Sequence, residues 1–171
     1  RAAGSFLFPA DFMLVAASNP CRCGYLFDRE IPCTCRPHMV SGYFQKISGP
    51  IIDRIDMEVL ADRVPYKDLM GAECPEKSER IRRRVTAARQ VQERRFTESV
   101  TRYNSRMTTA EIKNFCPITG ESGLVLESAI KRMNLTARSF YKIIKVSRTI
   151  ADLEGSRDIE KKHILEALSY K

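Results

Sequence analysis

From residue 77 to the end, the chain repeats the apolar spacing of helix faces and shows no alternation typical of a strand. Leu126, Ala129, Ile130 and Met133, for example, recur at i, i+3, i+4 and i+7. A helix with this spacing is stable when its apolar stripe packs against neighbouring helices. The sequence therefore predicts an all-α helical bundle over residues 77–171.

Residues that favour the start or the end of a helix divide this half of the chain. Thr108 and Glu111 form a capping box for a short helix that should run to about residue 115. Thr136 is a good N-cap, and Gly155 should end the helix that Thr136 begins. Another helix is predicted over residues 77–95.

A last helix is expected near the C-terminus. Asp158 can serve as its N-cap, and Ile159, Leu165 and Leu168 supply its apolar residues.

The N-terminal part has a different pattern. Residues 12–17 form a continuous apolar run of strand length, limited by Pro9 and Pro20. Such a run predicts a buried parallel strand, whose carboxyl end would open into a site. Residues 55–59 alternate apolar and polar side chains, which also favours a strand. The fold class expected is α/β over residues 1–62, then a linker over 63–76 and the bundle over 77–171, so that the chain is mostly helical.

Four cysteines fall within fifteen residues, in a loop rich in Cys, Pro and Gly: Cys21, Cys23, Cys33 and Cys35. Four thiolates match the tetrahedral closed site of structural zinc, although the C-x-C spacing is tighter than the common C-x₂-C. A set of reduced thiols is the alternative. His38 is near enough to replace one cysteine, but a surface histidine is the simpler interpretation.

Charge and hydropathy limit the partners. The formal net charge is +8, which suits a polyanionic partner such as nucleic acid but also suits arginine-rich helix faces in solvent. Seven arginines crowd residues 80–95, where glutamates dilute them, and a solvated or subunit-facing helix is favoured over a DNA groove contact. No apolar run approaches the roughly 20 residues that span a bilayer, so no membrane partner is expected. No signal peptide is evident, and a cytoplasmic location is expected.

Four segments together resemble the magnesium-chelatase-like AAA+ ATPases of the competence-protein (ComM) type. They read FPADFMLVAASNPCRCGY, ISGPIIDRIDMEV, LTARSFYKIIKVSRTIADLEGS and HILEALSYK. Their order matches the family, and they span nearly the whole chain. The resemblance implies the C-terminal part of an AAA+ core followed by a helical lid, in a homo-oligomeric ring expected to be a hexamer. ATP and Mg²⁺ would be bound between neighbouring subunits.

The chain departs from the family pattern in one respect. It contains no G-x-x-x-x-G-K-[ST] loop, the element that cradles the phosphates. We therefore expect the parent protein to be an ATPase and this segment alone, which begins at Arg1, to be an inactive piece of it.

The resemblance also assigns roles to three residues. Asn19 matches sensor 1, which orients the attacking water or contacts the γ-phosphate; an Asn-Pro turn is the alternative. Arg54 matches the arginine finger, with an ion pair to Asp53 or Asp56 as the alternative. Arg138 matches sensor 2, which reaches the phosphates from the lid; a solvated arginine at a helix end is the alternative.

Three functions stay open at this point. Competence-type relatives resemble helicases that act on branched DNA during natural transformation, and the cysteine-rich insert favours this DNA-remodelling class. A motor subunit of a metal chelatase is the second. A zinc-stabilised nucleic-acid-binding module without enzymatic activity is the third.

Overall fold

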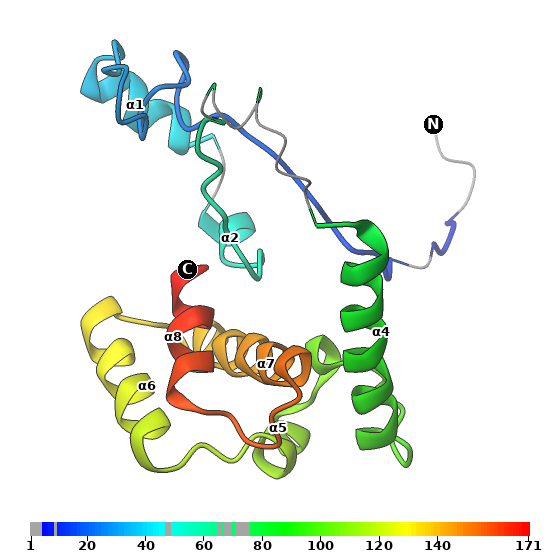
Figure 1. Cartoon of the computed structure of the whole chain (residues 1–171). Coiled ribbons are helices and arrows are strands. Elements are labelled where there is room, and N and C mark those ends of the chain that lie inside the picture. The colour runs from blue at the N-terminus through cyan, green and yellow to red at the C-terminus, as the bar shows by residue number, and fades with distance from the viewer. Residues whose placement is uncertain (1–4, 9, 47–48, 65, 67–69, 71–75) are drawn as a thin grey trace. The chain divides into compact units, whose positions relative to one another are not determined.

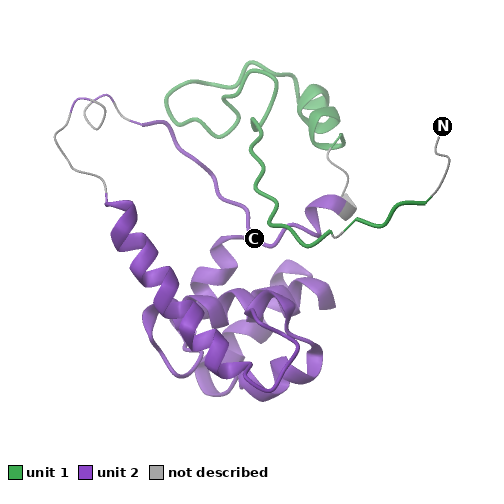
Figure 2. Ribbon diagram, turned by 90° about the vertical axis from the view of Figure 1, so that its right-hand side faces the viewer, with its two compact units in different colours: residues 1–47 green, residues 48–171 purple. Residues whose placement is uncertain are grey.

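The computed structural model describes residues 5–8, 10–46, 49–64, 66, 70 and 76–171 (Figure 1). The chain divides into two compact units, residues 1–47 and residues 48–171 (Figure 2). Cys74 and most of the linker expected over residues 63–76 lie outside the described residues. The domain division expected from the sequence stays a prediction.

The first unit is mostly loop. Its helix α1 (Pro37–Phe44) follows the cysteine-rich stretch and has Pro37 at its first turn, where a missing N–H costs nothing. Residues 12–17 carry no regular secondary structure, and Phe12 and Met13 are 71% and 87% exposed. A strand needs backbone hydrogen bonds from a neighbouring strand, and within the described residues no segment supplies them. The α/β part of the expected fold is therefore not seen.

The second unit is helical, as the sequence predicts. After the single turn α2 (Gly49–Ile52), the bundle consists of α4 (Ser78–Arg95), the 3₁₀ turn η1 (Asn104–Arg106), α5 (Thr109–Phe115), α6 (Gly120–Met133), α7 (Ala137–Glu154) and α8 (Lys161–Ser169). Helix α7 packs against α4, α5, η1 and α8, and α8 also packs against α6 (Figure 1). Helix α7 is thus the central element of the unit.

Helix ends follow local chemistry. Thr108 and Glu111 form the expected capping box of α5, and the Thr136 hydroxyl accepts a hydrogen bond from the backbone N–H of Ser139. Gly155 ends α7 with φ of 74°, a left-handed conformation that favours glycine. The Asp158 cap is wrong: Glu160 is the N-cap of α8, in a reciprocal box with His163. The last helix therefore begins two residues later than the sequence suggests.

The apolar core lies around α7. Ile143 and Ile144 of α7 and Ile164 of α8 are nearly or fully buried. Complete burial of such a side chain stabilises the fold by about 1.5–3 kcal/mol. Leu165, expected on the buried face of the last helix, is instead 49% exposed, because the face that meets α6 and α7 runs through Ile164 and Ala167.

None of the described helices is long and apolar enough to cross a membrane.

Candidate functional site

The segment 51–58 carries Arg54 just beyond α2. The backbone N–H of Arg54 donates to the carbonyl of Ile51 at 2.9 Å, and that of Ile55 donates to Ile52 at 2.9 Å. These bonds close a tight turn that leaves Arg54 exposed. The segment then meets the end of the chain, where the Glu58 N–H donates to the Tyr170 carbonyl at 2.8 Å. The C-terminal end of residues 51–58 is therefore anchored to the end of the helical bundle.

Lys142 of α7 holds the middle of the same segment. Its Nζ donates to the carbonyls of Asp53 at 2.6 Å and Ile55 at 2.8 Å, and lies 3.7 Å from a carboxylate oxygen of Asp56. The side chain is only 14% exposed, and this partial burial lowers the pKa of Lys142. Lys142 is therefore not a surface charge, because the segment 51–58 covers it.

Arg138 occupies the first turn of α7, as the sequence predicts. Its Nη1 lies 3.5 Å from Oδ2 of Asp53, and its side chain is 55% exposed. Lys142 follows four residues later, on the same face of α7. Asp53 pairs with Arg138 and Asp56 with Lys142, so both acidic neighbours of Arg54 contact cations of α7. The structure thus brings two of the three predicted nucleotide-contacting residues, Arg54 and Arg138, to the N-terminal half of one helix.

A sequence signal for Lys142 existed. A predicted helix that begins at Thr136 places Lys142 one turn after Arg138. In the Asp-Arg-Ile-Asp stretch, one acidic residue lies on each side of Arg54. Sequence reasoning missed the contact between Lys142 and this stretch because its hydrogen-bond partners Asp53 and Ile55 lie 89 and 87 residues earlier in the chain.

Asn19 lies in the first unit. It is exposed and directly precedes Pro20, at the end of the apolar run. Its role as sensor 1 stays a prediction.

The cysteine cluster (Cys21, Cys23, Cys33 and Cys35) is assembled within the first unit. All four Sγ atoms lie within 4.8 Å of one another. The Sγ of Cys21 is 3.3 Å from that of Cys23 and 3.7 Å from that of Cys33. A tetrahedral zinc with bonds of about 2.3 Å separates its sulfurs by about 3.8 Å. The cluster therefore has the composition and nearly the size of a zinc-thiolate site.

The backbone around the cluster shapes it for thiolates. Gly24 adopts φ of 84°, and its N–H donates to the Cys21 carbonyl at 3.1 Å, which turns the chain between the first pair of cysteines and the residues after them. The backbone N–H of Tyr25 and then that of Thr34 lower the pKa of Cys23 to about 5. The loop thus stabilises a negative sulfur at the position of Cys23.

The Cys33 sulfur behaves differently. The backbone N–H of Cys35 favours a Cys33 thiolate, but burial and the neighbouring Cys23 and Cys21 sulfurs outweigh it and raise the pKa of Cys33 to about 12. Like charges this close cannot all form without a cation among them. A bound dication removes that conflict, because metal-bound thiols are deprotonated.

Other candidate ligands are not part of the cluster. His38 is exposed and is absent from the group of sulfurs, in agreement with a surface histidine. Cys116 is buried in the helical core, 3.9 Å from the Met107 sulfur, and burial raises the pKa of Cys116 to about 11. Cys116 is therefore a residue of the apolar core and not a further ligand of the cluster.

A buried charged cluster ties α4 to α7. Asp152 has a fully buried side chain and accepts from both Arg95 and Arg148, of which Arg148 is only 2% exposed. Asn104 of η1 also donates to Asp152, at 2.8 Å. Arg148 is therefore not a surface charge, and Arg95 does not belong to the solvated face of α4. Both arginines hold the bundle together and are not available to a ligand.

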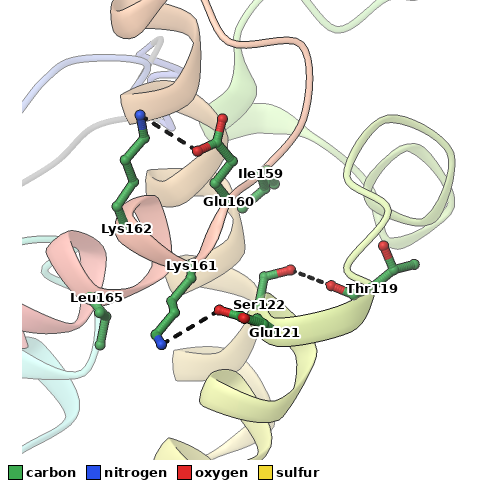
Figure 3. A pocket seen from close by; sticks show the side chains of 8 residues that line it. All are labelled: Thr119, Glu121, Ser122, Ile159, Glu160, Lys161, Lys162 and Leu165. Carbon is green, nitrogen blue, oxygen red and sulfur yellow. Dashed lines mark hydrogen bonds and ion pairs between the residues drawn. The ribbon is translucent and has the colours of Figure 1, made fainter.

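A shallow pocket of about 540 Å³ lies between α6 and α8 (Figure 3). Its polar side chains pair with one another: Lys161 lies 3.5 Å from Glu121, and Lys162 lies 3.6 Å from Glu160. None of the residues predicted to bind nucleotide or metal lines it. The pocket therefore adds no convergent polar groups to the candidate site.

Two family models match successive parts of the chain. Residues 1–69 match the model described as magnesium chelatase, subunit ChlI. Residues 75–171 match the model described as magnesium chelatase, subunit ChlI C-terminal. Together they cover both units.

Curated relatives match the whole chain. The competence protein ComM of Haemophilus influenzae is 33% identical over 172 residues, and the protein YifB of Escherichia coli is 34% identical over 172 residues. A protein of Mycobacterium tuberculosis, Rv2897c, is 28% identical over 171 residues. In each case the match covers 100% of this chain and 33% of the relative. The chain thus spans about a third of the length of the curated relatives it matches.

Proposed function

The chain belongs to the magnesium chelatase ChlI family, and we propose that it is the sensor, arginine-finger and lid portion of an AAA+ ATPase. The observation that carries this proposal is the joint attachment of Arg138 and Lys142 to the residues on either side of Arg54. A cation that contacts phosphate must be exposed and held in a fixed position. Helix α7 carries Arg138 directly and holds Arg54 through its neighbours. The resemblance described above implies phosphate contacts for Arg54 and Arg138, and this geometry supports the proposal.

Each residue has a distinct role in this proposal. Arg54 stabilises the charge that develops on the γ-phosphate of ATP bound by a neighbouring subunit, a contribution that can reach about 10³- to 10⁵-fold in rate. Arg138 contacts phosphate from the first turn of α7, where a helix N-terminus already favours anions. ATP with Mg²⁺ supplies the reacting phosphoryl group in the parent protein.

The first unit completes the AAA+ core. In the parent protein residues 12–17 pair with other strands of an α/β sheet, which accounts for the exposed apolar side chains of this run. Asn19 then lies at the carboxyl end of a strand, where ligands of open α/β sheets bind. The whole assembly is a homo-oligomeric ring.

The partner of this motor is DNA. One relative is named a competence protein, and the net charge of +8 favours a polyanion. The family name itself suggests the alternative, a motor subunit that drives a metal chelatase. A zinc-stabilised nucleic-acid-binding module without hydrolysis is the remaining candidate.

The cysteine cluster binds a structural zinc ion. Four sulfurs within 4.8 Å form a closed donor set without a position for a reacting ligand. Cys21 is fully buried, but the loop that carries the cluster otherwise contributes little to any apolar core. A metal would supply the stability that this loop lacks.

ATP hydrolysis by the intact protein, measured with and without branched DNA, tests the proposal. We expect DNA to stimulate hydrolysis, and Arg54→Ala to lower kcat by at least about 10³-fold while nucleotide affinity is unchanged. Arg132→Ala, at an exposed arginine near the end of α6, is the matched control and should retain activity. Hydrolysis indifferent to DNA would favour the chelatase motor, and absence of hydrolysis would favour the binding module.

A further inference from the structure

The ammonium group of Lys142 lies between two carbonyl oxygens on either side of Arg54. The bond to Asp53 is 2.6 Å and the bond to Ile55 is 2.8 Å. These carbonyls belong to the peptide units that precede Arg54 and follow Ile55. Fixing both peptide planes limits the backbone rotations between them, and those rotations set the direction of the Arg54 side chain.

The contact is stronger than a surface lysine would make. The donor is charged, and charge-assisted hydrogen bonds are shorter and roughly twice as strong as neutral ones. The Lys142 side chain is 14% exposed, and the Asp56 carboxylate, 3.7 Å away, supplies a counter-charge. Water therefore has limited access to replace the lysine at these carbonyls.

Arg138 of α7 adds a second contact to this segment. Arg138, one turn before Lys142, pairs with the Asp53 carboxylate at 3.5 Å. Residues 53–56 are thus held by two cations on one face of the central helix. A displacement of α7 would carry Arg54 with it.

We propose that Lys142 is a positioning residue that fixes Arg54 for catalysis and couples its orientation to the lid helix α7. This role rests on the proposed function of Arg54 as an arginine finger. Lys142 itself touches neither the nucleotide nor the reacting atoms, and acts only through the backbone of residues 53–55.

The kinetic test uses Lys142→Met in the intact protein, which keeps the aliphatic stem and removes the donors. Misplacing a catalytic group by about 1 Å can cost about 100-fold, so kcat should fall about 10- to 100-fold while nucleotide affinity is unchanged. Lys142→Arg, which keeps cationic donors, should restore most of kcat. The double variant Arg54→Ala/Lys142→Met should be no slower than Arg54→Ala alone, because residues that act as a unit are not additive.

Hydrogen exchange tests the same contact without ATP hydrolysis. In Lys142→Met the backbone amides of residues 53–58 should exchange faster, while those of α7 stay protected. Lys145→Met is the matched control: Lys145 lies on the same helix, is also partly buried, and donates to the Ser105 carbonyl at 2.9 Å. It should leave residues 53–58 unchanged.

The two measurements separate two failures. Unchanged exchange of residues 53–58 in Lys142→Met, or additive losses in the double variant, would overturn the positioning role of Lys142. If residues 53–58 exchange faster in Lys142→Met but Arg54→Ala hydrolyses ATP normally, the assignment of Arg54 as an arginine finger is wrong. The contact between Lys142 and the backbone would still be supported.

Discussion

Arg95 of α4 forms an ion pair with the carboxylate of Asp152 of α7, which lies 57 residues later in the chain. The two guanidinium nitrogens Nη1 and Nη2 lie 2.7 Å and 2.5 Å from the two carboxylate oxygens. Arg148 approaches the same carboxylate from within α7. One buried cation, Arg148, and one partly buried cation, Arg95, therefore depend on one buried anion, and Arg148 also donates to the carbonyls of Ser156 and Arg157.

Asp152→Asn should strongly destabilise the helical unit. The amide keeps the shape of the side chain but removes the negative charge that pairs with both Arg95 and Arg148. Breaking a buried ion pair from one side costs about 3–5 kcal/mol, because the remaining charge is left uncompensated. Urea unfolding followed by circular dichroism should show this loss.

Glu127→Gln is the control for that measurement. Its carboxylate pairs with Lys131 on the surface of α6, where both side chains are more than half exposed. Exposed pairs contribute little, so the unfolding curve should hardly move. Equal effects of the two substitutions would contradict the role assigned to Asp152.

Acid should weaken the α5 capping box. The Ser99 hydroxyl and then the backbone N–H of Thr108 lower the pKa of Glu111 from 4.5 to about 2. Because the folded-state pKa lies below the unfolded value, the stabilisation is present above about pH 4.5 and is lost as the pH falls toward 2. Unfolding measured across this range should therefore depend less on pH in Glu111→Gln than in the unaltered chain.

Glu98→Gln removes an exposed carboxylate in the turn that follows α4 and serves as the matched control. The stability of Glu98→Gln should depend on pH as steeply as that of the unaltered chain. If Glu98→Gln and Glu111→Gln flatten the profile equally, the capping box is not its source.

The features that the sequence predicts well are local. Thr108 and Thr136 cap helices through bonds to residues three positions away, so their spacing alone identifies them. Asp158 was the wrong cap because Glu160 and His163 satisfy each other's backbone N–H groups, a reciprocal pairing that the usual capping residues do not indicate. The helical half was therefore predictable nearly to the residue.

Burial of charge was not predictable in the same way. Arg95, Arg148 and Lys142 are of residue types that usually lie at the surface, and the partners of Arg95 and Lys142 are distant in sequence. The packing of α4 on α7 brings Arg95 to Asp152, and segment 51–58 covers Lys142. Arg148 pairs within α7 and with the carbonyls that follow it. For the site, the sequence placed Arg138 correctly in the first turn of a helix but missed the lysine that holds the residues around Arg54.

Zinc removal should unfold the cysteine-rich loop and leave the helical unit intact. The purified chain should contain about one zinc per molecule, and its four clustered thiols should react with a thiol reagent only after a chelator is added. Zinc analysis, thiol titration and amide spectra of residues 20–36 provide the three readouts.

Cys35→Ser and Cys116→Ser separate a metal site from a general effect of thiol loss. Cys35→Ser removes one of four donors from the cluster, so zinc should be lost or bound far more weakly. Cys116→Ser alters a buried thiol of the helical core, far along the chain from the cluster, and should retain one zinc while lowering stability. A folded loop that contains no zinc, with four freely titrating thiols, would show that the sulfurs meet for packing alone.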